Sequence, residues 1–309
     1  MNTITILIFA LVTLSIFLYV FILNGTWPKS SNFTLDFNKI RELADASKDE
    51  LPTHINHLII ATGELPSWGV VAGDFGNNYP IEFPSFQLVY QDKTAIIEVP
   101  FNNKLFNKFP YGKSFSQDAY EMMQKALLQA EFIIPTHEHW DHLGGIAQSD
   151  NIQKLLPKLV LTEKQKNGPT IKDAEFPEHS LDRFQAISYE KYYRVAPGLV
   201  LIDAPGHSEG HQLIFIKLQN GQEILFTGDI LWVTSNLKKQ KARPLIANMK
   251  RHENRKLISH QMKWIYDEFY SNKDQKILML TTHDPDQHME YKEKGILHSE
   301  FQLTNDSQH

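Results

Sequence analysis

Short runs of apolar and β-branched residues alternate with polar, turn-rich segments along most of the chain, as in strands separated by loops. These strand-like runs occupy residues 57–63, 86–100, 131–136, 158–163, 199–205, 212–218, 223–229 and 276–282. The Asn220-Gly221 pair between two of the runs predicts a β-hairpin over 212–229. Helical periodicity is clearest over 116–130 and 253–270. Many short strands with few helices between them predict an α/β (α+β) fold of mixed sheets covered by helices.

The first segment has a different pattern, because residues 4–23 are apolar and carry no charge. A helix of that length, at about 1.5 Å per residue, spans a hydrocarbon core of about 30 Å. A cleaved signal peptide is the alternative, but no Lys or Arg precedes the run and no small-residue cleavage site follows it. We therefore interpret residues 1–23 as a single-pass transmembrane anchor, which places the protein in a membrane. Lys29, Lys39 and Arg41 weakly favour a cytoplasmic C-terminal side.

Residues 24–50 are expected to form a linker that contains a short amphipathic helix, with Leu35, Ile40 and Leu43 near one face. The remaining residues, 51–309, form the predicted globular domain. They are numerous enough to bury a sizeable core.

Composition narrows the function classes. The net charge of −5 lacks the basic excess that is typical of nucleic-acid binders, so no nucleic-acid partner is expected. The chain has no cysteine, which excludes disulfides, thiolate metal ligands and cysteine nucleophiles.

The stretch "PTHEHWDHLGG" at 135–145 concentrates metal-binding side chains directly after an apolar run. Its candidate ligands are His137, His139, Asp141 and His142. Imidazole and carboxylate groups suit Zn²⁺ and neighbouring first-row ions. The alternative is a surface loop in which the histidines occur by chance.

Three more candidate ligands follow predicted strands, namely His207 after "LIDAPG", Asp229 in "LFTGD" and His283 after "LMLTT". The shared context weakens the chance interpretation of the first motif. Five histidines and two aspartates are enough for two ions with three protein ligands each and one bridging carboxylate.

The ordered motifs H-x-H-x-D-H, G-H, G-D and H resemble those of the metallo-β-lactamase-fold superfamily over about residues 55–290. The resemblance implies an αββα sandwich of two mixed β-sheets flanked by helices, with a dinuclear metal site at one sheet edge in a catalytic domain over 51–309. It also implies that one ion is held by His137, His139 and His207, the other by Asp141, His142 and His283, and that Asp229 bridges them.

Two positions depart from the family pattern. Glu98 stands where the family commonly has an aspartate that supports the metal loops. Trp232 stands where enzymes that resemble acyl-homoserine lactonases often have a tyrosine. An indole cannot transfer a proton as a phenol can, so the lactonase analogy is weakened.

The resemblance predicts a membrane-anchored hydrolase of an ester, lactone or related acyl bond, with a small-molecule or lipid-like substrate. Two divalent ions, zinc first and iron or manganese as alternatives, would hold a bridging hydroxide, which the catalytic residues Asp141 and Asp229 orient. A metal-dependent phosphodiesterase acting on a lipid or nucleotide is one alternative. A non-catalytic binding protein that the metal stabilises is another. The oligomeric state stays open.

Several weaker features complete the picture. His211 is either a residue that orients a ligand or a plain surface residue, and Asp284 has either a supporting or proton-donating role or is a simple turn residue. The basic stretch 236–256 is interpreted as solvated helix and loop, with contact to an anionic substrate or to membrane headgroups as the alternative. Histidines without comparable context are expected at the surface, namely His54, His57, His179, His252, His260, His288, His298 and His309.

Overall fold

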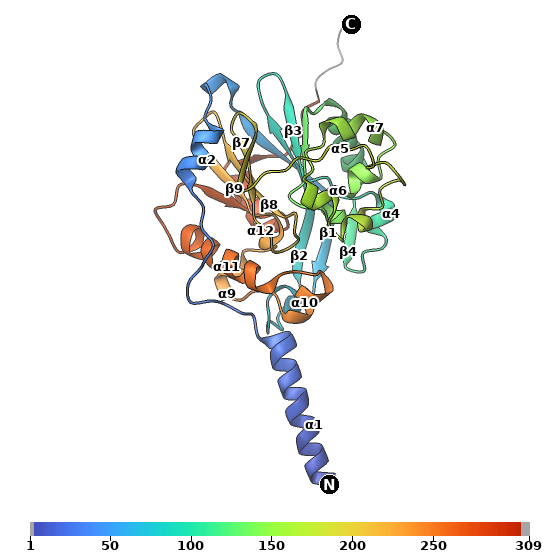
Figure 1. The fold of residues 1–309 in the computed structure, drawn as a ribbon, viewed down its shortest axis with the longest axis vertical. Coiled ribbons are helices and arrows are strands. Elements are labelled where there is room, and N and C mark those ends of the chain that lie inside the picture. The colour runs from blue at the N-terminus through green and yellow to red at the C-terminus, as the bar shows by residue number, and fades with distance from the viewer. Residues whose placement is uncertain (1–2, 304–309) are drawn as a thin grey trace.

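Two mixed β-sheets pack face to face in the computed structural model of the chain, which describes residues 3–303 (Figure 1). The first sheet has the strand order β11-β1-β2-β3-β5, with β4 also paired to β1. Its strands are β1 His54–Leu65, β2 Tyr79–Val89, β3 Thr94–Ile97, β4 Gly112–Phe115, β5 Phe132–Ile134 and β11 Leu297–His298. The second sheet, of order β10-β9-β8-β7-β6, consists of β6 Tyr192–Ala196, β7 Leu199–Asp203, β8 Gln212–Lys217, β9 Glu223–Phe226 and β10 Leu278–Leu280.

Both sheets contain parallel and antiparallel pairs, which confirms the predicted fold class. β1 with β11, β3 with β5, and β9 with β10 are parallel, whereas the other neighbours are antiparallel. The predicted hairpin over 212–229 is also confirmed, since β8 and β9 flank a turn in which Gly221 has a φ of 88°. The prediction of a strand at 158–163 is wrong, because this segment forms only isolated bridges at Leu159 and Thr162.

Alternating side chains on the strands supply both faces of the second sheet. Leu199 and Leu201 of β7 join the core between the two sheets, while Val200 and Ile202 join the core on the opposite face. Each of these side chains is fully buried. Burial of such a side chain contributes about 1.5–3 kcal/mol, so the two apolar faces of one strand hold three layers together.

Helices cover the outer face of each sheet. On the first sheet, α5 (Gln117–Gln129) and α6 (Trp140–Ala147) bury apolar side chains such as Met123 against β3 and β5. On the second sheet, α2 (Phe37–Ala44) and α11 (Arg255–Ile265) do the same with Ile40 and Ile258. The layers are therefore helix, sheet, sheet and helix, as the αββα prediction requires. The predicted helices at 116–130 and 253–270 correspond to α5 and to α11 with its π-helical extension Tyr266–Tyr270.

The remaining helices are short and connect the layers. They are α3 Ser67–Val70, α4 Asn103–Phe106, α7 Ile152–Leu155, α8 Glu163–Lys166, α9 Ser235–Lys239, α10 Leu245–Lys250 and α12 Pro285–Glu293, with 3₁₀ turns at Lys48–Glu50, Leu156–Lys158, Ile171–Ala174 and Gly228–Ile230.

The N-terminal helix α1 (Thr3–Leu18), extended by a π-helical segment at Tyr19–Leu23, projects away from the sandwich (Figure 1). This stretch of 21 residues has a mean hydropathy of 2.9 and α1 contains no buried residue, so the helix is long and apolar enough to cross a membrane. The chain then runs along the body, where the Gly25 carbonyl accepts a hydrogen bond from the Ala242 amide and Trp27 packs edge-on against Tyr266.

Candidate metal centre

The carboxyl ends of five strands bring polar side chains to one edge of the sandwich. β3 and β5 run parallel, and β7, β9 and β10 share a direction because β8 is antiparallel to both β7 and β9. The side chains that follow these strands are Glu98, His137, His207, Asp229 and His283. These five residues are distant in the sequence, but the loops that follow the strands bring them to the same edge.

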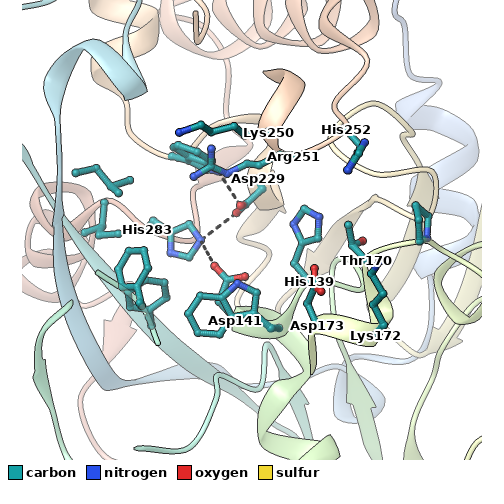
Figure 2. Close-up of a pocket in the computed structure, with 17 residues that line it drawn as sticks. His139, Asp141, Thr170, Lys172, Asp173, Asp229, Lys250, Arg251, His252 and His283 are labelled. Atoms are coloured by element: carbon teal, nitrogen blue, oxygen red, sulfur yellow. Dashed lines mark hydrogen bonds and ion pairs between the residues drawn. The ribbon is translucent and has the colours of Figure 1, made fainter. Parts of the chain in front are cut away.

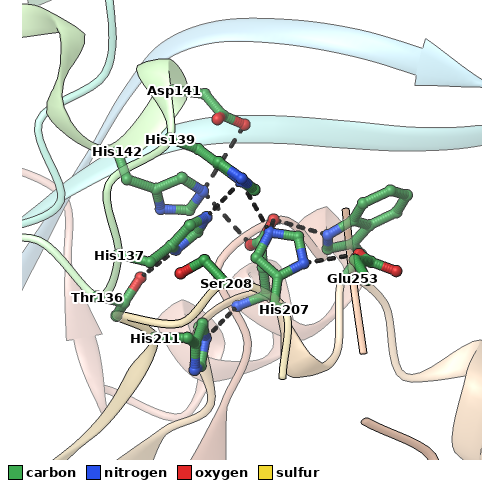
Figure 3. A network of polar contacts seen from close by, with 12 residues as sticks. Thr136, His137, His139, Asp141, His142, His207, Ser208, His211 and Glu253 are labelled. Atoms are coloured by element: carbon green, nitrogen blue, oxygen red, sulfur yellow. Dashed lines mark hydrogen bonds and ion pairs between the residues drawn. The ribbon is translucent and has the colours of Figure 1, made fainter. Parts of the chain in front are cut away.

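Three imidazole nitrogens converge at the first cluster, as Figure 3 shows. His139 Nδ1 lies 2.9 Å from His137 Nε2 and 2.9 Å from His207 Nε2. His139 is the residue before α6, and its extended backbone (φ −69°, ψ 154°) turns the ring toward the other two. Burial lowers the pKa of His137 and His139, and the surrounding imidazoles lower it further. Both rings are therefore neutral and present lone pairs, which metal binding requires.

Two carboxylates and two imidazoles form the second cluster. His283 Nε2 lies 3.1 Å from Asp229 Oδ1 and 3.8 Å from Asp141 Oδ2. His142 Nε2 lies 3.4 Å from Asp229 Oδ1 and 3.7 Å from Asp141 Oδ2. Gly145 allows α6, which carries Asp141 and His142, to lie close to the Pro100 backbone, because a Cβ at this position would lie 2.4 Å from the Pro100 carbonyl oxygen.

Asp229 joins the clusters. Its Oδ1 faces His142 and His283, while its Oδ2 lies 3.3 Å from His207 Nε2. Burial acts to raise the pKa of Asp229, but His283, His142 and His207 hold it well below its usual range. This carboxylate is therefore ionised and has one oxygen available to each cluster.

The donor set fits two divalent ions. His142 Nε2 and Asp229 Oδ1 are buried and have no hydrogen-bond partner within residues 3–303. A buried polar atom without a partner costs about 1–3 kcal/mol, and a cation between these atoms would remove that cost. The structure thus brings together all seven side chains that the sequence analysis singled out, in the two groups that the resemblance implied.

Glu98 supports the second cluster from behind. Its Oε2 accepts a hydrogen bond from His142 Nδ1 at 2.8 Å, and its Oε1 accepts one from the Thr136 hydroxyl. The residue has a φ of 63°, in the left-handed region that non-glycine residues rarely adopt, so the backbone stores strain where β3 ends. A glutamate therefore makes the supporting contact that was in question at this position.

Glu253 has the same relation to the first cluster and was missed in the sequence analysis. Its Oε1 accepts a hydrogen bond from His207 Nδ1 at 2.7 Å, its Oε2 accepts one from Arg243 Nε at 3.2 Å, and Arg243 Nη2 forms an ion pair with Oε1 at 2.9 Å. The Glu253 and Arg243 side chains have no exposed surface. In the sequence this segment is marked only by its basic residues. That pattern does not predict that Glu253 pairs with a histidine 46 residues away.

His211 shapes the turn that carries Asp229. Its Nδ1 donates to the Ala204 carbonyl, and its Nε2 accepts the Asp229 amide at 3.1 Å. Gly228 has a φ of 51°, and a Cβ there would lie 2.4 Å from His211 Nε2. His211 thus orients a candidate ligand rather than occupying the surface.

Trp232 and Asp284 have structural contacts near the centre. The Trp232 indole Nε1 donates to Asp229 Oδ2 at 2.7 Å. Asp284 caps α12 by accepting from the Asp286 and Gln287 amides, and it also accepts from the Thr234 amide at 2.7 Å. Its helix-capping role explains Asp284 without a proton-donating function.

Two of the histidines expected at the surface are buried, so that expectation is wrong for His57 and His288. Each is 1% exposed, and the His57 ring on β1 packs against the His288 ring on α12 with centroids 4.6 Å apart. His288 Nδ1 lies 2.9 Å from Glu82 Oε2, and the Glu82 carbonyl accepts from His283 Nδ1 at 2.6 Å. Glu82 therefore connects this pair to the candidate ligand His283. His309 lies outside the described residues.

A cavity of about 500 Å³ opens beside the clusters (Figure 2). His139, Asp141, Asp229 and His283 reach its wall, so a ligand in the cavity would contact the centre directly. Its apolar wall comprises Leu65, Ile81, Phe83, Phe109, Trp140 and Trp232.

The basic stretch 236–256 is not uniformly solvated. Its first lysines, at 238, 239 and 241, are exposed, as expected for a charge run. Arg243 is buried, however, and Lys250, Arg251 and His252 line the cavity. The second half of the stretch therefore belongs to the candidate site.

Solved structures with this architecture decide the fold. An N-acyl homoserine lactone hydrolase, with the product N-hexanoyl-L-homoserine bound at its catalytic metal centre, superimposes with a TM-score of 0.59. The match covers 78% of this chain and 96% of that one, at 17% identity. A hydrolase described as belonging to the beta lactamase superfamily matches with a TM-score of 0.52, at 16% identity, over 75% of this chain and 87% of that one. The chain has the metallo-β-lactamase fold.

Other proteins with this fold include a probable metal-dependent hydrolase from Staphylococcus aureus. It matches with a TM-score of 0.58 at 16% identity, over 76% of this chain and 90% of that one. Sequence comparison with family models finds no match.

Curated relatives match this metallo-β-lactamase-fold chain over a shorter stretch. An N-acyl homoserine lactonase of Bacillus thuringiensis is 28% identical over 107 residues, which is 35% of this chain and 41% of the relative. A hydroxyacylglutathione hydrolase of Albidiferax ferrireducens is 30% identical over 117 residues, or 38% and 40% of the two chains. The chain thus spans about two-fifths of the length of these relatives, and their activities enter only as proposals.

Proposed function

We propose that the protein is a metal-dependent hydrolase that cleaves an ester, lactone or related acyl bond with two divalent ions, zinc first among them. The observation that carries the proposal is the position of the Asp229 carboxylate. One of its oxygens faces the first cluster of candidate ligands and the other faces the second. The matched lactonase and hydroxyacylglutathione hydrolase support the acyl chemistry. The 21-residue apolar helix supports a membrane anchor at the N-terminus.

Bound at the two clusters, divalent ions supply Lewis acidity and lower the pKa of a water molecule toward neutrality. The chain's own residues keep the donor atoms in place. Glu98 and Glu253 accept hydrogen bonds from His142 Nδ1 and His207 Nδ1, which leaves the Nε2 atoms of both rings directed at the centre. Trp232 holds Asp229 Oδ2.

Asp141 is the assigned proton carrier. Both aspartates reach the cavity, but the Asp141 side chain is 16% exposed, whereas that of Asp229 is 5% exposed and accepts a hydrogen bond from Trp232. Trp232 cannot transfer a proton, so it cannot replace the tyrosine of the lactonase pattern. We therefore assign the Asp141 carboxylate to carry the proton between the attacking water and the leaving alcohol.

Metal content and turnover test the proposal together. Metal-replete protein should hold about two ions per chain and hydrolyse members of a panel of esters, lactones and thioesters. His139→Ala should lose at least one ion, and Asp229→Asn should lose activity on every substrate while the fold survives. Asp203→Asn is the matched control, because Asp203 ends β7 and pairs with Lys164 at the surface.

Two outcomes would refute the proposal. Protein that contains no stoichiometric transition metal under metal-replete conditions would remove the metal centre. Protein that binds two ions but turns over no acyl substrate would favour a metal-stabilised binding role.

A further inference from the structure

Arg251 is a cation that lines the wall of the cavity. Its guanidinium carbon lies 4.4 Å from the centroid of the Trp232 ring, and no carboxylate in residues 3–303 forms an ion pair with it. Arg243, whose guanidinium lies 4.5 Å from the same ring, is by contrast paired with Glu253. A guanidinium held against protein without an anion is costly, and a ligand oxyanion would offset that cost with charge-assisted hydrogen bonds.

Cations outnumber carboxylates in the part of the cavity wall that lies outside the candidate metal centre. Lys172 and Lys250 also line the cavity, as Figure 2 shows, and Asp173 is the acidic residue there besides Asp141 and Asp229. Because the two latter carboxylates belong to the candidate metal centre, the rest of the wall has an excess of positive charge. Such a wall raises the local concentration of anionic ligands.

An apolar groove continues the cavity beyond Arg251. This groove, of about 90 Å³, lies between α3 and α10 and is lined by Leu65, Pro66, Trp68, Tyr111, Ile246 and Ala247. It shares Trp232, Lys250 and Arg251 with the cavity, so these residues stand at the junction of an apolar and a charged compartment. A ligand that fills both compartments needs an apolar chain and an anionic group.

The groove lies on the face of the body from which α1 emerges. α10 lies beside the end of α1 (Figure 1), both α3 and α10 contact its π-helical segment, and the Gly73 amide donates to the Ile22 carbonyl. Tyr111 in the groove and Met249 in α10 are exposed. If α1 spans a bilayer, the groove opens toward the surface from which an amphiphile would enter.

We propose that the substrate is an anionic amphiphile, a long-chain acyl ester whose chain occupies the groove and whose oxyanion group binds Arg251. The inference rests on the proposed acyl hydrolysis. In that reaction water adds to the acyl carbon, the bond from that carbon to the alcohol oxygen breaks, and a proton passes to the leaving alcohol. A carboxylate and a phosphate share the required oxyanion chemistry.

Two isosteric esters test the charge requirement, namely O-octanoyl-lactate with a carboxylate and O-octanoyl-lactamide with a neutral amide. Wild-type protein should prefer the lactate ester by about tenfold or more in kcat/KM, because a hydrogen bond to a charged group is lost with the amide. Arg251→Gln should abolish this preference, and Arg251→Lys should retain part of it. The control is Lys238→Gln, which removes an exposed cation outside the cavity and should keep the full preference.

A second pair of substrates tests the groove. Gly69 lines it, and a Cβ at this position would meet nothing within 4 Å, so Gly69→Phe should fill the groove without disturbing the fold. The variant should lower kcat/KM for O-octanoyl-lactate but not for O-acetyl-lactate. An octanoyl ester of glycerol phosphate, compared with octanoylglycerol, shows whether a phosphate replaces the carboxylate.

Binding separates failure of this inference from failure of the proposed function. N-octanoylalanine and its neutral amide, titrated calorimetrically into metal-loaded protein, need no turnover. Tighter binding of the carboxylate to wild type than to Arg251→Gln supports the inference even if no ester is hydrolysed. Hydrolysis of esters with equal kcat/KM for the charged and neutral members, in wild type and Arg251→Gln alike, would overturn the inference and leave the proposed function standing.

Discussion

Replacement of Glu253 by glutamine removes the charge of a fully buried carboxylate without changing its shape. In the wild-type protein Arg243 Nε donates to Oε2, His207 Nδ1 donates to Oε1, and Arg243 Nη2 forms an ion pair with Oε1. Burial acts to raise the pKa of Glu253, but Arg243 and His207 lower it from 4.5 to about 2. With each pKa unit worth about 1.4 kcal/mol, the charged state stabilises the fold by about 3 kcal/mol.

The sign of the pH dependence follows from the lowered pKa. The contribution is fully present above the unfolded-state pKa of about 4.3 and is lost as the pH falls through about 2. At neutral pH, Glu253→Gln should therefore lower the free energy of unfolding by about 3 kcal/mol. The difference between wild type and the variant should shrink between about pH 4 and pH 2. Urea denaturation followed by tryptophan fluorescence, on metal-free protein in detergent, measures both effects.

The same variant, Glu253→Gln, should also bind zinc more weakly. Without a carboxylate at Nδ1, His207 is less well oriented, so zinc affinity should fall about 10–100-fold in a chelator competition. Glu223→Gln is the matched control, because Glu223 pairs with Arg41, whose side chain is 42% exposed. Such a pair contributes at most about 1 kcal/mol. If Glu253→Gln resembles this control in both stability and zinc affinity, the proposed role of the buried network is refuted.

Three further predictions concern other contacts. Glu98→Gly suits the φ of 63° but removes the His142 acceptor, so zinc affinity should fall about 10–100-fold by chelator competition while the circular dichroism spectrum is kept. Trp232→Phe loses the donor to Asp229 and should lower kcat about tenfold at unchanged metal content, which steady-state kinetics and metal analysis can check. Full-length protein should stay in carbonate-washed membranes, and removal of residues 1–23 should release folded protein. An intact N-terminus in the soluble fraction would contradict the anchor.

Local patterns in the sequence were sufficient to predict mixed sheets covered by helices, the hairpin at 212–229, the long helices and the apolar N-terminal helix, while the sandwich of two sheets followed from the family resemblance. They also sufficed to identify the candidate ligands, because each follows a predicted strand, and strands of one direction deliver their ends to one sheet edge. The exception among the strands, at 158–163, is instructive. An apolar run predicts burial, but strand pairing requires a neighbour along its whole length, and here only single bridges form.

Burial and partner choice were decided by the tertiary structure alone. One basic stretch divides into exposed Lys238, buried Arg243 and the cavity residue Arg251, and the charge pattern of the stretch does not distinguish these three positions. His57 and Glu253 likewise lack a local motif. Hydrophobic periodicity reports the backbone within a few residues, whereas the surroundings of a charged or imidazole side chain depend on which distant element packs over it. For that reason the clustering of the candidate ligands could be predicted from the sequence, but not the groups that hold them and line the cavity.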